Sequence, residues 1–226
     1  MRRRQRITRR DFLRRGSAAM ASAAPLFLAR DVLGSAASPG ANERIVLAII
    51  GMGQRGNQML HNIPAEGRVA AICDADQRKT AAATREHQAD WAVHRDYREL
   101  IERNDVDAVI VTACDHHHVL AGILACQAGK DVYVEKPLSL YVREGRALVA
   151  AARKHQRVVQ TGTQQRTMEM NRFACEFVRG GGLGQVRVVE CVNFNGPMAY
   201  PAEGLPGEPI PEGVDWDLWQ GQAPER

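Results

Sequence analysis

Apolar residues in this chain gather in short runs that are separated by longer stretches of mixed polarity. The run at residues 45–50 is entirely apolar, and the runs at 69–73 and 107–112 are nearly so. Short apolar runs without alternation are typical of strands that are covered on both faces of a sheet. On this basis we predict strands at residues 45–50, 69–73, 91–94, 107–112, 131–135 and 157–161.

The stretches between these runs predict helices. They cover residues 76–88, 97–102, 116–128 and 140–155, and a further helix follows a glycine-rich turn at residues 51–56. Strands that alternate with helices indicate an α/β fold in which helical crossovers join parallel strands. The pattern therefore predicts a doubly wound parallel sheet over residues 42–162.

The pattern changes after residue 162. Residues 168–179 have the spacing of an amphipathic helix, and residues 185–195 alternate between apolar and polar side chains as a long strand does. From Gly196 onward the chain is rich in proline and glycine, with Trp216 and Trp219 near its end. We therefore expect residues 163–226 to form a second unit of different architecture.

Positive charge is concentrated at the N-terminus. Nine of the 30 lysines and arginines precede Ser38, against two of the 26 acids, so the remainder carries 21 bases and 24 acids. Nucleic-acid binding needs clustered positive charge on the folded part of a protein, and a net charge of −3 there argues against it.

The basic N-terminus resembles the twin-arginine export signal of bacteria. Residues 8–14 read Thr-Arg-Arg-Asp-Phe-Leu-Arg, an alanine-rich stretch follows at 16–29, and small residues at 34–37 offer a cleavage region. The apolar stretch is too short to span a membrane, and no cysteine lies nearby for a lipid, so we expect no stable membrane anchor. We assign residues 1–37 to a signal segment and expect a periplasmic or other extracytoplasmic protein. A disordered basic arm is the alternative.

Neither the cysteines nor the histidines indicate a metal site. The five cysteines are an odd number and well separated, so we interpret them as small core residues rather than disulfides or metal ligands. Residues 116–118 are three successive histidines. Successive residues on a helix point about 100° apart, so we do not expect all three to converge on one ion.

The most informative motif spans residues 44–74. A glycine pattern, G-x-G-x-x-G, follows the first strand, and Asp74 ends the second, which is the dinucleotide-binding arrangement of a Rossmann fold. Gly51 allows the tight turn, Gly53 lets a pyrophosphate approach the backbone, and Gly56 lets the helix pack on the strand. Asp74 can accept hydrogen bonds from a ribose diol. A glycine-rich turn without a ligand is the alternative. The predicted cofactor contacts are Gly51, Met52, Gly53, Gln54, Arg55, Gly56 and Asp74.

A second motif ends the strand at residues 131–135. The strand is followed by Lys136 and Pro137, and its last residue is Glu135. Because the carboxyl ends of parallel strands line the ligand crevice of an open sheet, we expect Lys136 beside the glycine turn, near a nicotinamide. The alternative is a surface lysine that precedes a turn.

Together these motifs resemble the glucose–fructose oxidoreductase / inositol dehydrogenase (Gfo/Idh/MocA) family of NAD(P)-dependent oxidoreductases. The resemblance runs from about residue 42 to the end of the chain. Its elements are the glycine turn, residues 73–76 (Cys-Asp-Ala-Asp), 129–138 (Gly-Lys-Asp-Val-Tyr-Val-Glu-Lys-Pro-Leu), 159–166 (Val-Gln-Thr-Gly-Thr-Gln-Gln-Arg) and 215–219 (Asp-Trp-Asp-Leu-Trp).

The resemblance implies hydride transfer between a nicotinamide cofactor and a sugar, cyclitol or related polyol. Lys136 would hydrogen-bond the reacting hydroxyl, and burial in a closed site would ease its proton exchange. Glu135 would orient the lysine or the nicotinamide ribose. The carboxylate of Asp74 favours NAD over NADP, although Arg78 and Lys79 leave NADP open.

Further site residues follow from the resemblance alone. Gln165 and Arg166 are candidate substrate contacts, and Asp115 and His118 are candidate cofactor contacts. His118 matches a histidine of the family, but Ala113-Cys114 stands where the family usually has Thr-Pro. The rigidity that a proline gives this loop is therefore missing.

The family's second domain is an open, mostly antiparallel sheet that supplies the substrate pocket and usually a catalytic histidine. Only 64 residues follow Gly162 here, and none is a histidine. We therefore expect residues 163–226 to be the truncated start of an α+β second domain, completed by missing sequence, a homo-oligomer or a complementing chain. A non-catalytic NAD-binding fragment or sensor is the alternative function. A methyltransferase that uses S-adenosylmethionine is a third hypothesis, but it has no need of the Glu-Lys-Pro strand.

Overall fold

The computed structural model of the protein describes residues 40, 43–192 and 206–224. Two predicted segments lie wholly or partly outside this part. They are the signal segment at residues 1–37 and the last three residues of the strand predicted at 185–195. The chain divides into a unit of residues 1–44 and a unit of residues 45–226. The strands and α-helices of the described residues belong to the second unit.

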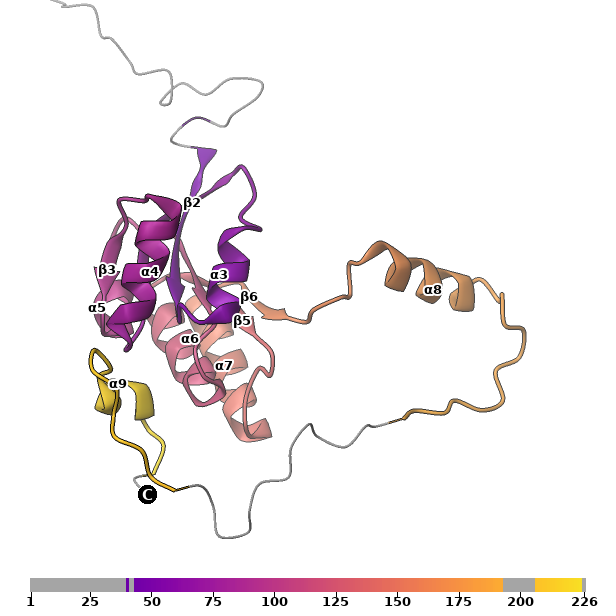
Figure 1. The fold of residues 1–226 in the computed structure, drawn as a ribbon. Helices are drawn as coiled ribbons and strands as arrows, with labels where there is room; N and C mark the ends of the chain where they lie inside the picture. Colours follow the sequence, from indigo (N-terminus) through magenta and orange to yellow (C-terminus); the bar gives the residue numbers. More distant parts are fainter. Residues whose placement is uncertain (1–39, 41–42, 193–205, 225–226) are drawn as a thin grey trace, which may run out of the picture. The chain divides into compact units, whose positions relative to one another are not determined.

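Six parallel strands form one sheet in the order β3-β2-β1-β4-β5-β6 (Figure 1). The strands are β1 (Ile45–Ile50), β2 (Gly67–Cys73), β3 (Ala92–His94), β4 (Ala108–Val111), β5 (Asp131–Glu135) and β6 (Val159–Gly162). β1 pairs with β2 on one side and with β4 on the other, so the strand order reverses between β1 and β4. Ligands of open α/β sheets bind at the carboxyl ends of the strands at such a reversal. The predicted Rossmann-type, doubly wound parallel sheet is confirmed.

Helices cover both faces of the sheet because successive strand residues point to opposite faces. On one face, Ile49, Ile72 and Ile110 pack with side chains of α3 (Gln54–Leu60) and α4 (Gln77–His87). On the other face, the neighbouring strand residues Ile50, Val109 and Val111 pack with α5, α6 and α7. These helices span Tyr97–Ile101, His118–Gln127 and Val142–His155.

Acidic residues fix where two of these helices begin. The carboxylate of Asp76 accepts a hydrogen bond from the Arg78 N–H at 3.0 Å at the start of α4. Asp96 accepts one from the Arg98 N–H at 2.9 Å at the start of α5. Each carboxylate thereby satisfies an N–H group that has no partner within its helix. Both helices therefore start directly after the strands β2 and β3, at the edge where the cofactor motif lies.

The segment after β6 differs from its prediction. Residues 169–179 form the helix α8 (Glu169–Arg179) as predicted, and none of its residues is buried. Residues 185–192, however, do not form the predicted strand, and Val188 and Val189 are 73% and 76% exposed. A strand needs a neighbour to pair its N–H and C=O groups, and no strand in the described residues pairs with this segment. A final helix, α9, spans Trp216–Gln220. Within the described residues, no helix is both long and apolar enough to cross a bilayer.

The cysteines are free, but they are not all core residues. Cys73 and Cys126 are buried as predicted, whereas Cys114, Cys175 and Cys191 are exposed. The prediction was wrong for these three because an apolar sequence neighbourhood does not ensure tertiary cover. Cys175 and Cys191 lie in the exposed segment after β6, and Cys114 lies in the loop after β4.

Candidate functional site

The turn between β1 and α3 needs glycine at two positions for the fold itself. Gly51 has a φ of +96°, and a Cβ there would lie 2.5 Å from the backbone nitrogen of Ala113. A Cβ on Gly56 would collide with the carbonyl oxygen of Gly51. At Gly53, in contrast, a Cβ would meet nothing within 4 Å. The missing side chain at Gly53 therefore serves no contact within the protein and leaves the backbone open to a ligand.

Thr112, which follows β4, fastens this turn to the sheet. Its hydroxyl donates to the carbonyl oxygen of Gly51 at 2.7 Å and lies 3.2 Å from that of Ile50. Its backbone N–H donates to the same Ile50 oxygen at 2.8 Å. Because Thr112 is buried, these bonds hold the turn in one position before any ligand arrives.

Asp74 follows β2 and faces the turn, as the motif predicts. One carboxylate oxygen accepts from the Met52 N–H at 2.7 Å, and the other accepts from the Asp76 N–H at 2.8 Å. A carboxylate has about four acceptor positions, so two stay available for a ribose diol. Asp74 thus also has a structural role, which is to lock the glycine turn onto the end of β2.

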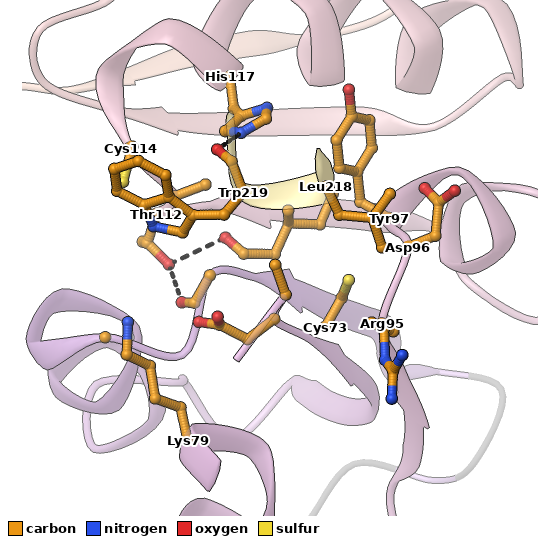
Figure 2. A pocket seen from close by; sticks show the side chains of 16 residues that line it. Cys73, Lys79, Arg95, Asp96, Tyr97, Thr112, Cys114, His117, Leu218 and Trp219 are labelled. Atoms are coloured by element: carbon orange, nitrogen blue, oxygen red, sulfur yellow. Dashed lines mark hydrogen bonds between the residues drawn. The ribbon is translucent and has the colours of Figure 1, made fainter. Parts of the chain in front are cut away.

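A hollow lies between the ends of β2 and β4, and we call it the β2–β4 hollow (Figure 2). The glycine turn and the predicted ribose acceptor both border it, through Gly51, Gly53 and Asp74. Side chains that the sequence did not assign to the cofactor complete its lining, among them Tyr97, Cys114, His117, Leu218 and Trp219. The hollow therefore extends the predicted dinucleotide site toward β3 and α9.

Two of the three successive histidines, His116 and His117, meet at one acceptor, which is a backbone carbonyl. The Nε2 atoms of His116 and His117 lie 3.0 Å and 2.8 Å from the carbonyl oxygen of Trp219. A carbonyl only accepts, so each Nε2 must carry the proton. Both residues belong to the 3-10 turn η2 (Asp115–His117).

Burial lowers the pKa of His117, and its neighbours His116 and His118 lower it further, although the bond to Trp219 acts the other way. Its Nδ1 atom is buried and has no hydrogen-bond partner among the described residues. His117 is therefore held in the neutral form by its surroundings.

Lys136 lies on the other side of the loop after β4, in a second hollow that we call the Lys136 hollow. Its lining includes the predicted residues Gln54, Arg55, Asp115, His118, Glu135 and Lys136. Thr112 and Ala113 border both hollows, so the two adjoin at the loop after β4. Lys136 itself is exposed. The resemblance implied a buried Lys136, but the residues that line this hollow leave the Lys136 side chain open to solvent.

Glu135 is buried and collects several hydrogen bonds in this hollow. Its Oε1 accepts from the Arg55 Nε at 2.8 Å and from the Tyr133 hydroxyl at 3.1 Å, and its Oε2 accepts from the Lys136 N–H at 3.0 Å. Burial acts to lower the pKa of Arg55, but the bond and charge of Glu135 outweigh it and raise that pKa overall. The pair links α3 to β5 and fixes the backbone from which the Lys136 side chain extends.

His118 lines the Lys136 hollow but is almost completely buried. It is 1% exposed, and its ring nitrogens lie 2.6 Å from the Pro137 oxygen and 3.0 Å from the Ala113 oxygen. A neutral imidazole has one N–H and can donate to one of these carbonyls at a time. His118 therefore ties the loop after β4 to the loop after β5. Asp115 is exposed at the start of η2.

The candidate substrate contacts are both exposed, and neither Gln165 nor Arg166 lines the Lys136 hollow. Gln164 lines it instead. Gln165 has a φ of +68°, a left-handed backbone conformation that turns the chain directly after this point. The structure thus brings together the glycine turn, Asp74, Glu135 and Lys136, but leaves Gln165 and Arg166 outside this group.

Sequence reasoning missed Thr112, Gln164 and the α9 residues as parts of the site. Thr112 carries no motif signal, since a threonine at the end of a strand is common. Leu218 and Trp219 belong to a segment that only the family resemblance singled out, and their place beside Asp74 depends on the tertiary fold.

Away from the crevice, one group of side chains in the described residues has metal-ligand spacing. Ligand atoms of His61, Glu86 and His87 lie within 4.8 Å of one another. His61 follows α3, and the other two end α4. Because these helices run antiparallel to the strands, the group lies at the edge opposite the glycine turn.

Known proteins similar to this chain share the same type of cofactor domain. The profile of a family described as "Oxidoreductase family, NAD-binding Rossmann fold" (GFO_IDH_MocA) matches residues 45–163. Inositol 2-dehydrogenase 1 of Saccharopolyspora erythraea is 31% identical over 157 residues, which cover 66% of this chain and 45% of that protein. Inositol 2-dehydrogenase of Salmonella paratyphi B is 28% identical over 151 residues, with 65% of this chain and 45% of that protein covered. The chain thus spans about half the length of these relatives.

A solved structure gives the same result for the fold. Myo-inositol 2-dehydrogenase from Lactobacillus plantarum superposes with a TM-score of 0.59 and 26% sequence identity. The superposition covers 63% of this chain and 43% of that one.

Proposed function

The chain belongs to the Gfo/Idh/MocA family of oxidoreductases, and from that premise we propose that it transfers a hydride between a nicotinamide dinucleotide and a sugar, cyclitol or related polyol. One observation carries the proposal. The open backbone at Gly53, the acceptor Asp74 and the amine of Lys136 border two adjoining hollows at the carboxyl edge of one sheet. These are the groups that a pyrophosphate, a ribose diol and a reacting hydroxyl respectively require.

The residues present fit a dinucleotide. The space above Gly53 lets a pyrophosphate approach the N–H groups at the start of α3, which no side chain of the N-cap residue satisfies. Asp74 has acceptor capacity left for a ribose diol, and its negative charge disfavours the additional phosphate of NADP. We therefore propose NAD as the cofactor, with NADP as the weaker ligand.

The cofactor, when bound, accepts or returns a hydride at its nicotinamide ring. The protein's own part is to handle the proton and to hold the substrate hydroxyl. Lys136 would hydrogen-bond that hydroxyl and stabilise negative charge as it develops on the oxygen. Glu135 would keep the backbone of Lys136 in place through its bonds to Arg55 and to the Lys136 N–H.

The names of the relatives support the substrate class. All three relatives named above are inositol 2-dehydrogenases, and inositols are cyclitols with a secondary hydroxyl on each ring carbon. We propose a polyol of this kind, with Gln164 of the Lys136 hollow, and Gln165 and Arg166 beside it, as candidates to bind its hydroxyls.

Cofactor titration followed by a substrate panel tests the proposal. NAD should bind more tightly than NADP, and S-adenosylmethionine should not bind. Nicotinamide reduction should then be detectable with inositols or other polyols. Binding of NAD without turnover on any polyol would favour the alternative of a sensor or non-catalytic fragment. Failure to bind either nicotinamide dinucleotide would refute the proposal.

Replacement of Lys136 by methionine tests the catalytic assignment. We expect Lys136→Met to slow nicotinamide reduction by about 10²–10⁴-fold, the range for loss of a proton-transfer group. Lys154→Met, which removes an exposed lysine near the end of α7, is the matched control and should keep the wild-type rate. A near-wild-type rate in Lys136→Met would show that another group handles the proton.

We also propose that residues 1–37 direct export by the twin-arginine route. The proposal is supported by the motif at residues 8–14 and by the small residues at 34–37. This route transports folded proteins, which suits a protein that takes up its cofactor before export.

A further inference from the structure

We propose that residues 213–222 complete the cofactor site by forming the wall against which the adenine base packs, with Leu218 and Trp219 as the contacting side chains. These residues lie outside the matched family region of 45–163. The inference rests on the proposed function, because it assigns a further part of the same site.

Backbone hydrogen bonds attach the start of this segment to the end of β2. The Gln77 N–H donates to the Gly213 oxygen at 3.0 Å, and the Asp215 N–H donates to the Ala75 oxygen at 2.9 Å. A carboxylate oxygen of Asp215 also lies 3.7 Å from the guanidinium of Arg95, which follows β3. The segment is therefore held against the strand that carries Asp74.

The end of the segment is attached to η2, beyond β4. His116 and His117 both donate to the carbonyl oxygen of Trp219, and the Gln222 side chain donates to the carbonyl oxygen of His116. Gly221 lies so close to His117 that a Cβ there would be 2.5 Å from the ring. α9 thus bridges the ends of β2 and β4, across the β2–β4 hollow.

Asp74 and the glycine turn decide which end of the dinucleotide this hollow would take. If the ribose diol binds Asp74 and the pyrophosphate lies over Gly53, the base attached to that ribose must continue into the β2–β4 hollow. Lys136 borders the other hollow, so the nicotinamide belongs there.

The lining of the β2–β4 hollow suits a flat aromatic base. Leu218 and Trp219 face it from α9, together with Tyr97 and Cys73 (Figure 2). Asp215 accepts a hydrogen bond from the Leu218 N–H at 3.0 Å, which fixes the first turn of α9. An indole packed on a base gives affinity without sequence-specific hydrogen bonds, as aromatic platforms for bases do elsewhere.

The test compares NAD with ADP-ribose, which contains the adenosine and pyrophosphate but no nicotinamide. Titration calorimetry on the full chain measures both affinities for the wild type and for Trp219→Ala, Trp219→Phe and the control Phe173→Ala. We expect Trp219→Ala to weaken both ligands equally, by about tenfold or more, as loss of an aromatic partner of a base does. Trp219→Phe should retain most of the affinity. Phe173→Ala should stay within about twofold of the wild type, because this phenylalanine of α8 is 61% exposed and lines neither hollow.

The outcomes separate this inference from the proposed function. If the wild type binds both ligands and Trp219→Ala binds them equally well, the adenine wall is wrong and the cofactor proposal stands. If Trp219→Ala weakens NAD but not ADP-ribose, Trp219 acts elsewhere and the inference is also wrong. If the wild type binds neither ligand, the cofactor proposal fails and the inference fails with it. Thermal unfolding without ligand checks that each variant folds, and Trp219→Phe serves as the test if Trp219→Ala does not.

Discussion

At the residue scale, the three glycines of the turn have different physical reasons to be glycine. Gly51 and Gly56 are required by contacts within the protein, since a Cβ at either position would meet backbone atoms of Ala113 or Gly51. Gly53 has open space above it. The sequence motif predicts a glycine at all three positions without distinguishing them. The structure shows that the fold requires glycine at positions 51 and 56, whereas at position 53 only the approach of a ligand requires it.

This difference gives a paired prediction. Gly56→Ala should lower the free energy of unfolding by about 1–3 kcal/mol, because the new methyl group must displace the turn. Gly53→Ala should change it by less than about 0.5 kcal/mol but weaken NAD binding by about tenfold or more, because the methyl group occupies the pyrophosphate's path. Urea unfolding and NAD titration measure the two effects. Wild-type NAD affinity in Gly53→Ala would contradict the assigned path.

At the element scale, the central strands were predictable because β1, β2 and β4 are short apolar runs whose C-terminal halves are buried. β1 and β5 have the predicted bounds, β2 and β3 differ by one or two residues at one end, and β4 and β6 differ by one or two residues at each end. The segment at residues 185–192 shows where this reasoning fails. Its alternation is that of a strand, but the alternation specifies only a face, and a strand also requires a neighbouring strand to pair with.

The contact between η2 and α9 was not predictable from local sequence. His116 and His117 lie about 100 residues before Trp219, and only the tertiary fold brings their ring nitrogens to its carbonyl oxygen. Two of the three adjacent histidines thus share one backbone carbonyl as their acceptor.

His117 makes this contact dependent on pH. Its pKa in the folded protein is lowered, chiefly by burial, below the ordinary value of 6.5. As the pH falls through 6.5, the unfolded chain therefore takes up a proton that the folded protein does not, and the free energy of unfolding falls. The contribution of His117 to this loss of stability ends only when the pH is below the pKa of His117 in the folded protein. We expect the loss of stability between pH 7.5 and pH 5.5 to be smaller in His117→Gln than in the wild type.

Urea unfolding at the two pH values measures this difference. His155→Gln, at the end of α7, controls for the removal of a histidine remote from α9. An equal loss of stability in the wild type and His117→Gln would show that His117 does not contribute.

At the scale of the whole molecule, the strand order places the reversal between β1 and β4, and this sets where the site lies. The glycine turn follows β1, and Thr112 follows β4, so the two hollows adjoin at the loop after β4. The sequence predicts the parallel sheet through its alternation of strands and helices. The order of the strands follows from packing and from the handedness of the crossovers, which no single segment encodes.

The export proposal also concerns the whole chain. Arg9→Lys combined with Arg10→Lys should block processing and leave the protein in the cytoplasm, because the route reads the arginine pair itself. Pulse labelling with cell fractionation, in a bacterial host that has this route, measures the result. Arg2→Lys with Arg3→Lys is the matched control and should be exported. Processing that does not depend on Arg9 and Arg10 would refute the assignment.

The sequence by itself determined the α/β class, the bounds of most strands, the glycine turn, Asp74 and the Glu-Lys-Pro strand end. It could do so because each depends on a local pattern, either of burial or of backbone conformation. Only the tertiary structure decided that Lys136 is exposed, that His118 cross-ties two loops, and that Leu218 and Trp219 lie beside Asp74. These depend on contacts between residues far apart in the chain, and such contacts are set by how the elements pack rather than by any one of them.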